Sequence, residues 1–157
     1  MKKFNVCVPV IEMSFDELDA IDRRLVDEAR EATDRAYAPY SKFHVGAAIL
    51  LDNGEVVTGA NQENAAFPSG TCAERTTCYY AHARWPEARF EAIAVAARGT
   101  DGEFVADPVA PCGACRQALL EYETLAGHDV RVLLAGRDKV YILPSVHSTL
   151  PLAFSEF

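Results

Sequence analysis

The chain has 157 residues, a length that fits one domain and leaves little room for a second core, so we expect a single domain over residues 1–157. Half of the residues are hydrophobic, which excludes an intrinsically disordered chain. Fifteen basic and 23 acidic residues give a net charge of −8, and this balance argues against nucleic acid as a partner, because its phosphates need neutralising cations.

The first residues contain two lysines, but the apolar run that follows is too short for a signal peptide. No later stretch approaches the roughly 18 consecutive apolar residues of a membrane span. We therefore expect a cytoplasmic protein that binds no membrane. In that compartment, five cysteines indicate a metal site or catalysis before disulfides.

Residues 14–36 predict a long amphipathic helix. Ser14 and Glu17 have the spacing of a capping box, and apolar residues then recur every three or four positions as far as Ala36. Residues 38–41, which include Pro39, end this helix because proline cannot continue it.

The rest of the chain alternates between strand and helix patterns around a polar loop at 61–71. The expected elements are strands at 43–51 and 55–61, a helix at 72–85, a strand at 90–97, a helix at 112–122, and strands at 129–135 and 139–144. Helices that alternate with strands must cover both sheet faces. The pattern therefore predicts an α/β fold, a three-layer α/β/α sandwich with a mixed five-stranded sheet.

Three cysteines stand at the starts of two predicted helices. Cys112 and Cys115 are one helical turn apart, and Cys72 begins the other helix, so the helix dipoles favour their thiolate forms. Three thiolates form a soft ligand set that indicates zinc. Cys78 lies about 9 Å further along the helix from Cys72 and on another side, and no histidine has ligand spacing. We therefore expect a fourth position filled by water.

Glu74 lies in the first turn of its predicted helix, two residues after Cys72. By itself, a carboxylate at this position is typical of a stabilised helix start. Beside three zinc-binding cysteines, it indicates a catalytic acid and base that takes a proton from metal-activated water.

The segments TCAER and APCGACRQ resemble the zinc signature of cytidine deaminases, and PYSKFHVGAA and GANQENAAFPSG resemble that family's amino-terminal motifs. The resemblance covers about residues 39–122. It implies that Cys72, Cys112 and Cys115 hold Zn²⁺ and that Glu74 shuttles protons. It also implies hydrolytic deamination of cytidine and 2′-deoxycytidine to uridine and 2′-deoxyuridine, with release of ammonia, in pyrimidine salvage.

The same resemblance implies roles around the metal and the sugar. Arg75 resembles the arginine that hydrogen-bonds to ligand sulfurs and offsets their charge. Asn61 and Glu63 match the pair that binds ribose hydroxyls. A carboxylate beside the sugar would repel phosphate, so the expected substrate is a free nucleoside.

The resemblance also implies residues that contact the base or a neighbouring subunit. Phe43 matches a phenylalanine that packs near the base, and Ala73 matches an alanine whose backbone binds the pyrimidine edge. Phe154, in the ending LPLAFSEF, resembles a phenylalanine that enters a substrate pocket, its own or a neighbour's. Short chains of this family form homotetramers, which the resemblance implies here.

Three alternatives remain open at this level. A deaminase of a nucleoside antibiotic such as blasticidin S would carry the same zinc signature. The segment PCGAC at a helix start is also typical of a thiol oxidoreductase, in which Cys72 and Glu74 would be incidental. A structural zinc module would close its fourth position with a protein ligand.

Overall fold

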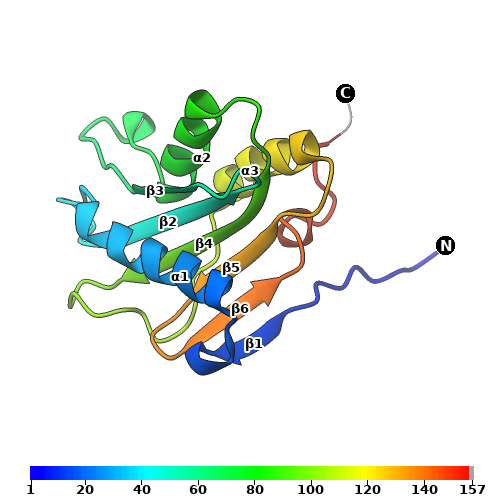
Figure 1. The fold of residues 1–157 in the computed structure, drawn as a ribbon, viewed down its shortest axis with the longest axis horizontal. Helices are drawn as coiled ribbons and strands as arrows, with labels where there is room; N and C mark the ends of the chain where they lie inside the picture. The colour runs from blue at the N-terminus through cyan, green and yellow to red at the C-terminus, as the bar shows by residue number, and fades with distance from the viewer. Residues whose placement is uncertain (156–157) are drawn as a thin grey trace.

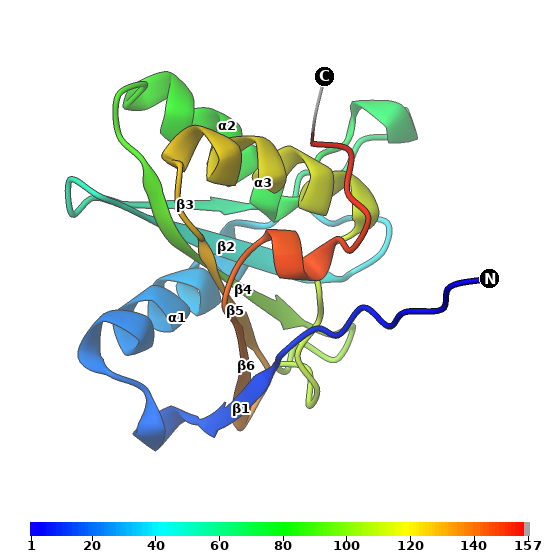
Figure 2. The same ribbon diagram turned by 90° about the vertical axis from the view of Figure 1, so that its right-hand side faces the viewer.

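The computed structural model describes residues 1–155 as three layers, with one helix on one face of a sheet and two helices on the other (Figure 1, Figure 2). In chain order the elements are β1 (Ile11–Ser14), α1 (Ala20–Ala32), β2 (His44–Leu51), β3 (Val56–Ala60), α2 (Ala73–Arg84), β4 (Phe90–Arg98), α3 (Gly113–Ala126), β5 (Arg131–Ala135) and β6 (Lys139–Leu143). The sheet order is β1-β6-β5-β4-β2-β3, and only β4 and β5 pair in parallel. The predicted three-layer α/β/α sandwich and mixed sheet are confirmed.

The sheet has six strands and not the predicted five, because β1 pairs antiparallel with β6. The capping box of Ser14 and Glu17 is present, but it caps a single 3₁₀ turn at Phe15–Glu17. The α-helix itself begins at Ala20, where the Asp19 carboxylate accepts hydrogen bonds from two backbone N–H groups. The helix predicted over 14–36 is therefore shorter in the structure, because Ser14 ends β1, Phe15–Glu17 form a 3₁₀ turn and the α-helix ends at Ala32.

Successive side chains of the central strand β4 point to opposite faces of the sheet, so they alternate between two hydrophobic clusters. Ile93 and Val95 point toward α2 and α3, while alanines alternate with them on the face that α1 covers. Small residues are needed on that face because α1 lies close to the sheet. At Gly46 in β2, an added Cβ would lie 2.2 Å from the carbonyl oxygen of Ala29 in α1.

Helices α2 and α3 lie side by side on the other face of the sheet (Figure 2). Both helices begin at the same end of this layer, where the loops at 61–72 and 99–112 lead into them. None of the helices within residues 1–155 is long and apolar enough to cross a membrane.

Candidate metal centre and adjoining cavity

The starts of α2 and α3 bring three cysteines together. Cys72 is the N-cap residue of α2, Cys112 is that of α3, and Cys115 lies in the first turn of α3. The Sγ of Cys112 lies 3.9 Å from the Sγ of Cys72 and 3.5 Å from that of Cys115, and all three sulfurs lie within 4.8 Å of one another. Tetrahedral zinc with Zn–S bonds of about 2.3 Å requires sulfurs about 3.8 Å apart. The sulfur cluster therefore fits zinc without a large rearrangement.

Neighbouring donors favour a thiolate at Cys72. Hydrogen bonding from the Cys115 thiol and from Arg75 lowers the pKa of Cys72 to about 5. Nη2 of Arg75 lies 3.9 Å from this sulfur, and the contact raises the pKa of the arginine. Arg75 therefore lies beside the Cys72 sulfur, where its positive charge can offset that of the thiolate.

Cys78 takes no part in the cluster. Its side chain is fully buried in the core under α2, and burial raises the pKa of its thiol to about 12. Its Sγ donates to the carbonyl oxygen of Arg75 at 3.6 Å. No histidine among residues 1–155 joins the three sulfurs either. The expectation of three cysteine ligands agrees with this arrangement.

Glu74 is held inside the protein beside the sulfurs. It lies in the first turn of α2 and is only 4% exposed. Burial raises the pKa of its carboxyl group, and the negative charge of Cys72 raises it further. A raised pKa means that this carboxyl group holds a proton more readily than an ordinary glutamate, a property that suits a group that must both accept and return a proton.

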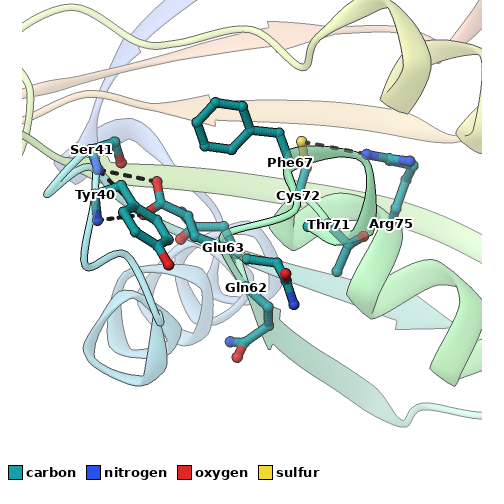
Figure 3. A pocket seen from close by; sticks show the side chains of 11 residues that line it. Tyr40, Ser41, Gln62, Glu63, Phe67, Thr71, Cys72 and Arg75 are labelled. Carbon is teal, nitrogen blue, oxygen red and sulfur yellow. Dashed lines mark hydrogen bonds between the residues drawn. The ribbon is translucent and has the colours of Figure 1, made fainter.

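A cavity of about 580 Å³ adjoins the cluster at Cys72 (Figure 3). Its walls come from the segment before β2, the loop between β3 and α2, and the start of α2. The lining residues are Tyr40, Ser41, Asn61, Gln62, Glu63, Asn64, Phe67, Gly70, Thr71, Cys72 and Arg75. The predicted residues Asn61, Glu63, Cys72 and Arg75 thus meet at one cavity.

The Glu63 carboxylate is held at the cavity wall by the segment before β2. It accepts a hydrogen bond from the Tyr40 backbone N–H at 2.8 Å and from the Ser41 N–H at 3.2 Å (Figure 3). Hydrogen bonding by the Ser41 side chain, followed by these backbone donors, lowers the pKa of Glu63. The group therefore remains an anion in the cavity.

The side-chain amide of Asn61 hydrogen-bonds to two backbone groups at the start of β2. Its Oδ1 accepts from the backbone N–H of Val45 at 2.8 Å, and its Nδ2 donates to the carbonyl oxygen of Phe43 at 2.9 Å. One amide hydrogen and one lone pair remain for another partner. This side chain therefore has a structural role as well as a place at the cavity.

Three predicted binding residues are absent from the cavity lining. Phe43 is half-buried and Ala73 is fully buried, while Phe154 is 68% exposed and its carbonyl oxygen accepts from Nε2 of Gln117. Two aromatic residues of the lining were not predicted from the sequence. Tyr40 and Phe67 contact each other edge to face, with ring centroids 6.5 Å apart. Tyr40 lies within the motif PYSKFHVGAA and Phe67 within GANQENAAFPSG, so the resemblance to the family's motifs could have indicated them.

Comparison with known proteins agrees with this geometry. The family model for the cytidine and deoxycytidylate deaminase zinc-binding region matches residues 19–126. The cytidine deaminase of Halalkalibacterium halodurans is 41% identical over 139 residues, which cover 86% of this chain and 96% of the relative. That of Sporosarcina psychrophila is 44% identical over 99 residues, covering 63% of this chain and 68% of the relative.

Solved structures of the same family have a similar fold. The cytidine deaminase of Burkholderia pseudomallei matches with a TM-score of 0.69 at 39% identity, covering 83% of this chain and 97% of its own. The cytidine deaminase of Mycobacterium tuberculosis matches with a TM-score of 0.69 at 33% identity, covering 88% of this chain and 100% of its own. With the family model spanning more than half of its length, the chain belongs to the zinc-dependent cytidine and deoxycytidylate deaminase family.

Proposed function

We propose that this protein hydrolyses cytidine and 2′-deoxycytidine to uridine and 2′-deoxyuridine and releases ammonia, as in pyrimidine salvage. The observation that carries the proposal is the buried carboxyl group of Glu74 beside three sulfurs that lie within 4.8 Å of one another. Cys72, Cys112 and Cys115 would hold the zinc. Bound zinc would lower the pKa of water from 15.7 toward roughly 7.

Glu74 moves the protons in this reaction. It takes a proton from the water that adds to C4 of the base and delivers that proton to ring nitrogen N3. A second transfer moves the remaining proton of the added hydroxyl group to the amino group, and the C4–N bond breaks to release ammonia as the carbonyl group of uracil forms. The raised pKa of its carboxyl group suits a residue that must act as both base and acid.

Arg75 supports the metal ligands and does not touch the base in this proposal. Three thiolates donate enough negative charge to weaken the acidifying effect of zinc on water. The guanidinium group beside Cys72 withdraws part of that charge through its hydrogen bond to sulfur.

Glu63 and Asn61 recognise the sugar. The carboxylate of Glu63 can accept from a sugar hydroxyl with its remaining lone pairs, and the free amide hydrogen of Asn61 can donate to one. An anionic wall at this position disfavours a phosphorylated sugar, so we expect nucleosides to bind better than nucleotides. The net charge of −8 acts in the same direction.

The role implied for Phe154 depends on a larger assembly, whereas those implied for Phe43 and Ala73 concern the base. We propose that residues 1–157 form one domain of a cytoplasmic homotetramer, in which Phe154 enters the cavity of a neighbouring subunit. The 68% exposure of Phe154 supports this role, because an apolar side chain at the surface gains most by burial in a partner. Phe43 would pack near the base, and the Ala73 backbone would contact its edge. Light scattering on the purified protein measures the subunit number.

The competing functions are less favoured. A thiol oxidoreductase needs only Cys112 and Cys115, and it gives no role to Cys72 or to the buried Glu74. A structural zinc module needs a fourth protein ligand, and residues 1–155 place only these three cysteines together. Deamination of a nucleoside antibiotic is the nearest alternative, and it is tested with blasticidin S in the same assay.

The direct experiment follows the ultraviolet absorbance of cytidine and the release of ammonia with zinc-loaded protein. We expect conversion of cytidine and 2′-deoxycytidine, and little conversion of cytidine 5′-monophosphate. The Glu74→Gln variant should retain its zinc and lose at least 1,000-fold in turnover, on the order of the contribution of a general acid–base group. Folded, zinc-loaded protein that leaves cytidine unchanged would refute the proposal.

A further inference from the structure

The first ten residues form an arm that leads away from the rest of the molecule (Figure 1, Figure 2). Residues 1–10, called the arm below, have no regular secondary structure, and every one of them is exposed. The arm runs directly into β1, which is an edge strand of the sheet and pairs only with β6 within residues 1–155. It is therefore an extension of an edge strand without a neighbour of its own.

One face of the arm is apolar. Phe4, Val6, Val8 and Val10 are 74%, 54%, 39% and 49% exposed. These residues alternate along the chain, so in an extended strand they lie on one side. On the other side, Pro9 and Ile11 line a groove next to α1. An uncovered strand with apolar residues at alternate positions is a template for pairing with another chain.

We propose that two copies of this chain pair their arms as antiparallel β-strands, in the register that places Cys7 of one copy opposite Cys7 of the other. The two-fold axis then passes between the cysteines, and every other contact occurs twice. Val6 lies opposite Val8, and Phe4 lies opposite Val10. The apolar residues of the two arms then lie side by side on one face of the paired strands, and each shields part of its neighbour's surface.

The charged residues favour this register over the two registers in which the axis is shifted by one residue. With the axis at Cys7, Lys2 of one copy lies opposite Glu12 of the other, and opposite charges on facing positions stabilise a strand pair. Moving the axis to Val6 or to Val8 breaks this ion pair, because Lys2 then lies opposite Val10 or Glu12 opposite Phe4, whereas Lys3 faces an uncharged residue in all three registers. Glu12 lies 3.7 Å from Lys139 and its side chain stays 59% exposed, which leaves it accessible to a second cation.

Proline fixes how the two strands must hydrogen-bond. Pro9 has no N–H to donate, so its pair with Asn5 belongs at a non-hydrogen-bonded position. Pairs alternate in type along an antiparallel ladder, and the Cys7 pair, two residues away, is therefore also non-hydrogen-bonded. Cα atoms at such a pair are about 4.5 Å apart, within the range that a disulfide spans. Cys7 therefore reports the register directly.

The experiment is oxidative cross-linking of the zinc-loaded protein, read on a denaturing gel without reductant. Diamide takes two electrons and two protons from a pair of thiols as the S–S bond forms. We expect a covalent dimer that the Cys7→Ser variant does not form. In the Cys7→Ser background, Asn5→Cys alone and Pro9→Cys alone should cross-link at least tenfold more slowly, and a mixture of the two variants should form the mixed dimer.

Two further variants test what holds the arms together. Val6→Lys should slow Cys7 cross-linking at least tenfold, whereas Ile21→Lys, which replaces an apolar residue of similar exposure (57%) on α1, should not. Lys2→Glu and Glu12→Lys should each slow the reaction, and the double variant should recover the original rate.

Failure of Cys7 to cross-link would overturn the proposal. Equal rates for thiols at positions 5, 7 and 9 would also overturn it, because they would indicate random collision between flexible ends. The gel separates covalent dimers whatever other contacts join the subunits, so the result does not depend on the homotetramer or on deaminase activity.

Discussion

The two polar side chains assigned to the sugar, Glu63 and Asn61, reach the cavity while hydrogen-bonded to the backbone around the start of β2. Their positions are fixed before a ligand arrives, so less conformational entropy is lost when a nucleoside binds. Each retains hydrogen-bonding capacity for the sugar. At the residue scale, the proposed site therefore combines a rigid wall for the sugar with a buried carboxyl group, Glu74, as the proposed proton carrier.

Hydrogen bonds that lower the pKa of Glu63 imply a specific pH dependence. Its carboxylate contacts stabilise the folded loop at pH values above the usual carboxyl pKa near 4.5, and this contribution is lost as the pH falls through the lowered pKa. Nuclear magnetic resonance of the Glu63 side chain should give a midpoint below 4.5. Ser41→Ala should raise that midpoint, because the Ser41 side chain is the largest cause of the shift. An unchanged midpoint in Ser41→Ala, equal to that of a Ser69→Ala control, would contradict this explanation.

Arg75 should be needed to retain the metal. Arg75→Gln removes the cation beside Cys72, so the pKa of that thiol rises and protons compete better with zinc. We expect zinc affinity at neutral pH to fall roughly 10- to 100-fold, measured by competition with a chelator. Arg84→Gln, at the exposed end of the same helix, should leave the affinity unchanged. Equal affinities in the two variants would exclude this role for Arg75.

The packing of α1 on the sheet depends on the small residues of β2 and β4. Gly46→Ala would place a Cβ 2.2 Å from the Ala29 carbonyl oxygen, so the helix must move away from the sheet. We expect the free energy of unfolding to fall by about 3 kcal/mol, measured by chemical denaturation. Gly113→Ala, whose new Cβ would have no atom within 4 Å, should leave the stability of the metal-free protein nearly unchanged. A similarly small effect at Gly46 would contradict the close approach of α1.

A buried carboxylate joins the last turns of α3 to the chain that follows it. Glu123 is 8% exposed and accepts from the backbone N–H groups of Val130, Val146 and His147 at 2.8, 2.7 and 2.9 Å. Glu123→Ala leaves these donors without a partner, so we expect a loss of roughly 3 kcal/mol in denaturation experiments. Glu121→Ala, at an exposed neighbour, is the control. If both variants lose the same stability, the carboxylate does not have this function.

Elements with a strong local pattern were predictable. The predicted strand at 90–97 is observed at Phe90–Arg98, and the predicted helix at 72–85 at Ala73–Arg84. Strand β1 was not, because four residues are too few to show a period and because a capping box next to them indicated a helix. Its existence depends on pairing with β6, which is a tertiary interaction.

The sulfur cluster was predictable in part for the same reason, because one helical turn separates Cys112 from Cys115. The cavity wall was predicted only in part, through Asn61 and Glu63. It depends on how the segment before β2 and the loop after β3 hydrogen-bond to each other, as the contact of Glu63 with Tyr40 illustrates. No periodicity in the sequence reports such a contact, so Tyr40 and Phe67 were missed.

At the scale of the whole molecule, the fold carries the site at the ends of two helices on one face of the sheet and leaves the opposite sheet edge for β1 and the arm. The two regions lie on different elements, so pairing of the arms does not require a change at the sulfur cluster. The chain as a whole carries a net charge of −8. It favours uncharged nucleosides as substrates over polyanions.

The most direct test of the account is X-ray absorption at the zinc edge of the purified holoenzyme, combined with its zinc content. We predict one zinc per chain, with three sulfur neighbours at about 2.3 Å and one oxygen or nitrogen neighbour at about 2.0 Å, the pattern of a catalytic site with an exchangeable position. Four sulfur neighbours would indicate a closed structural site and would contradict the account.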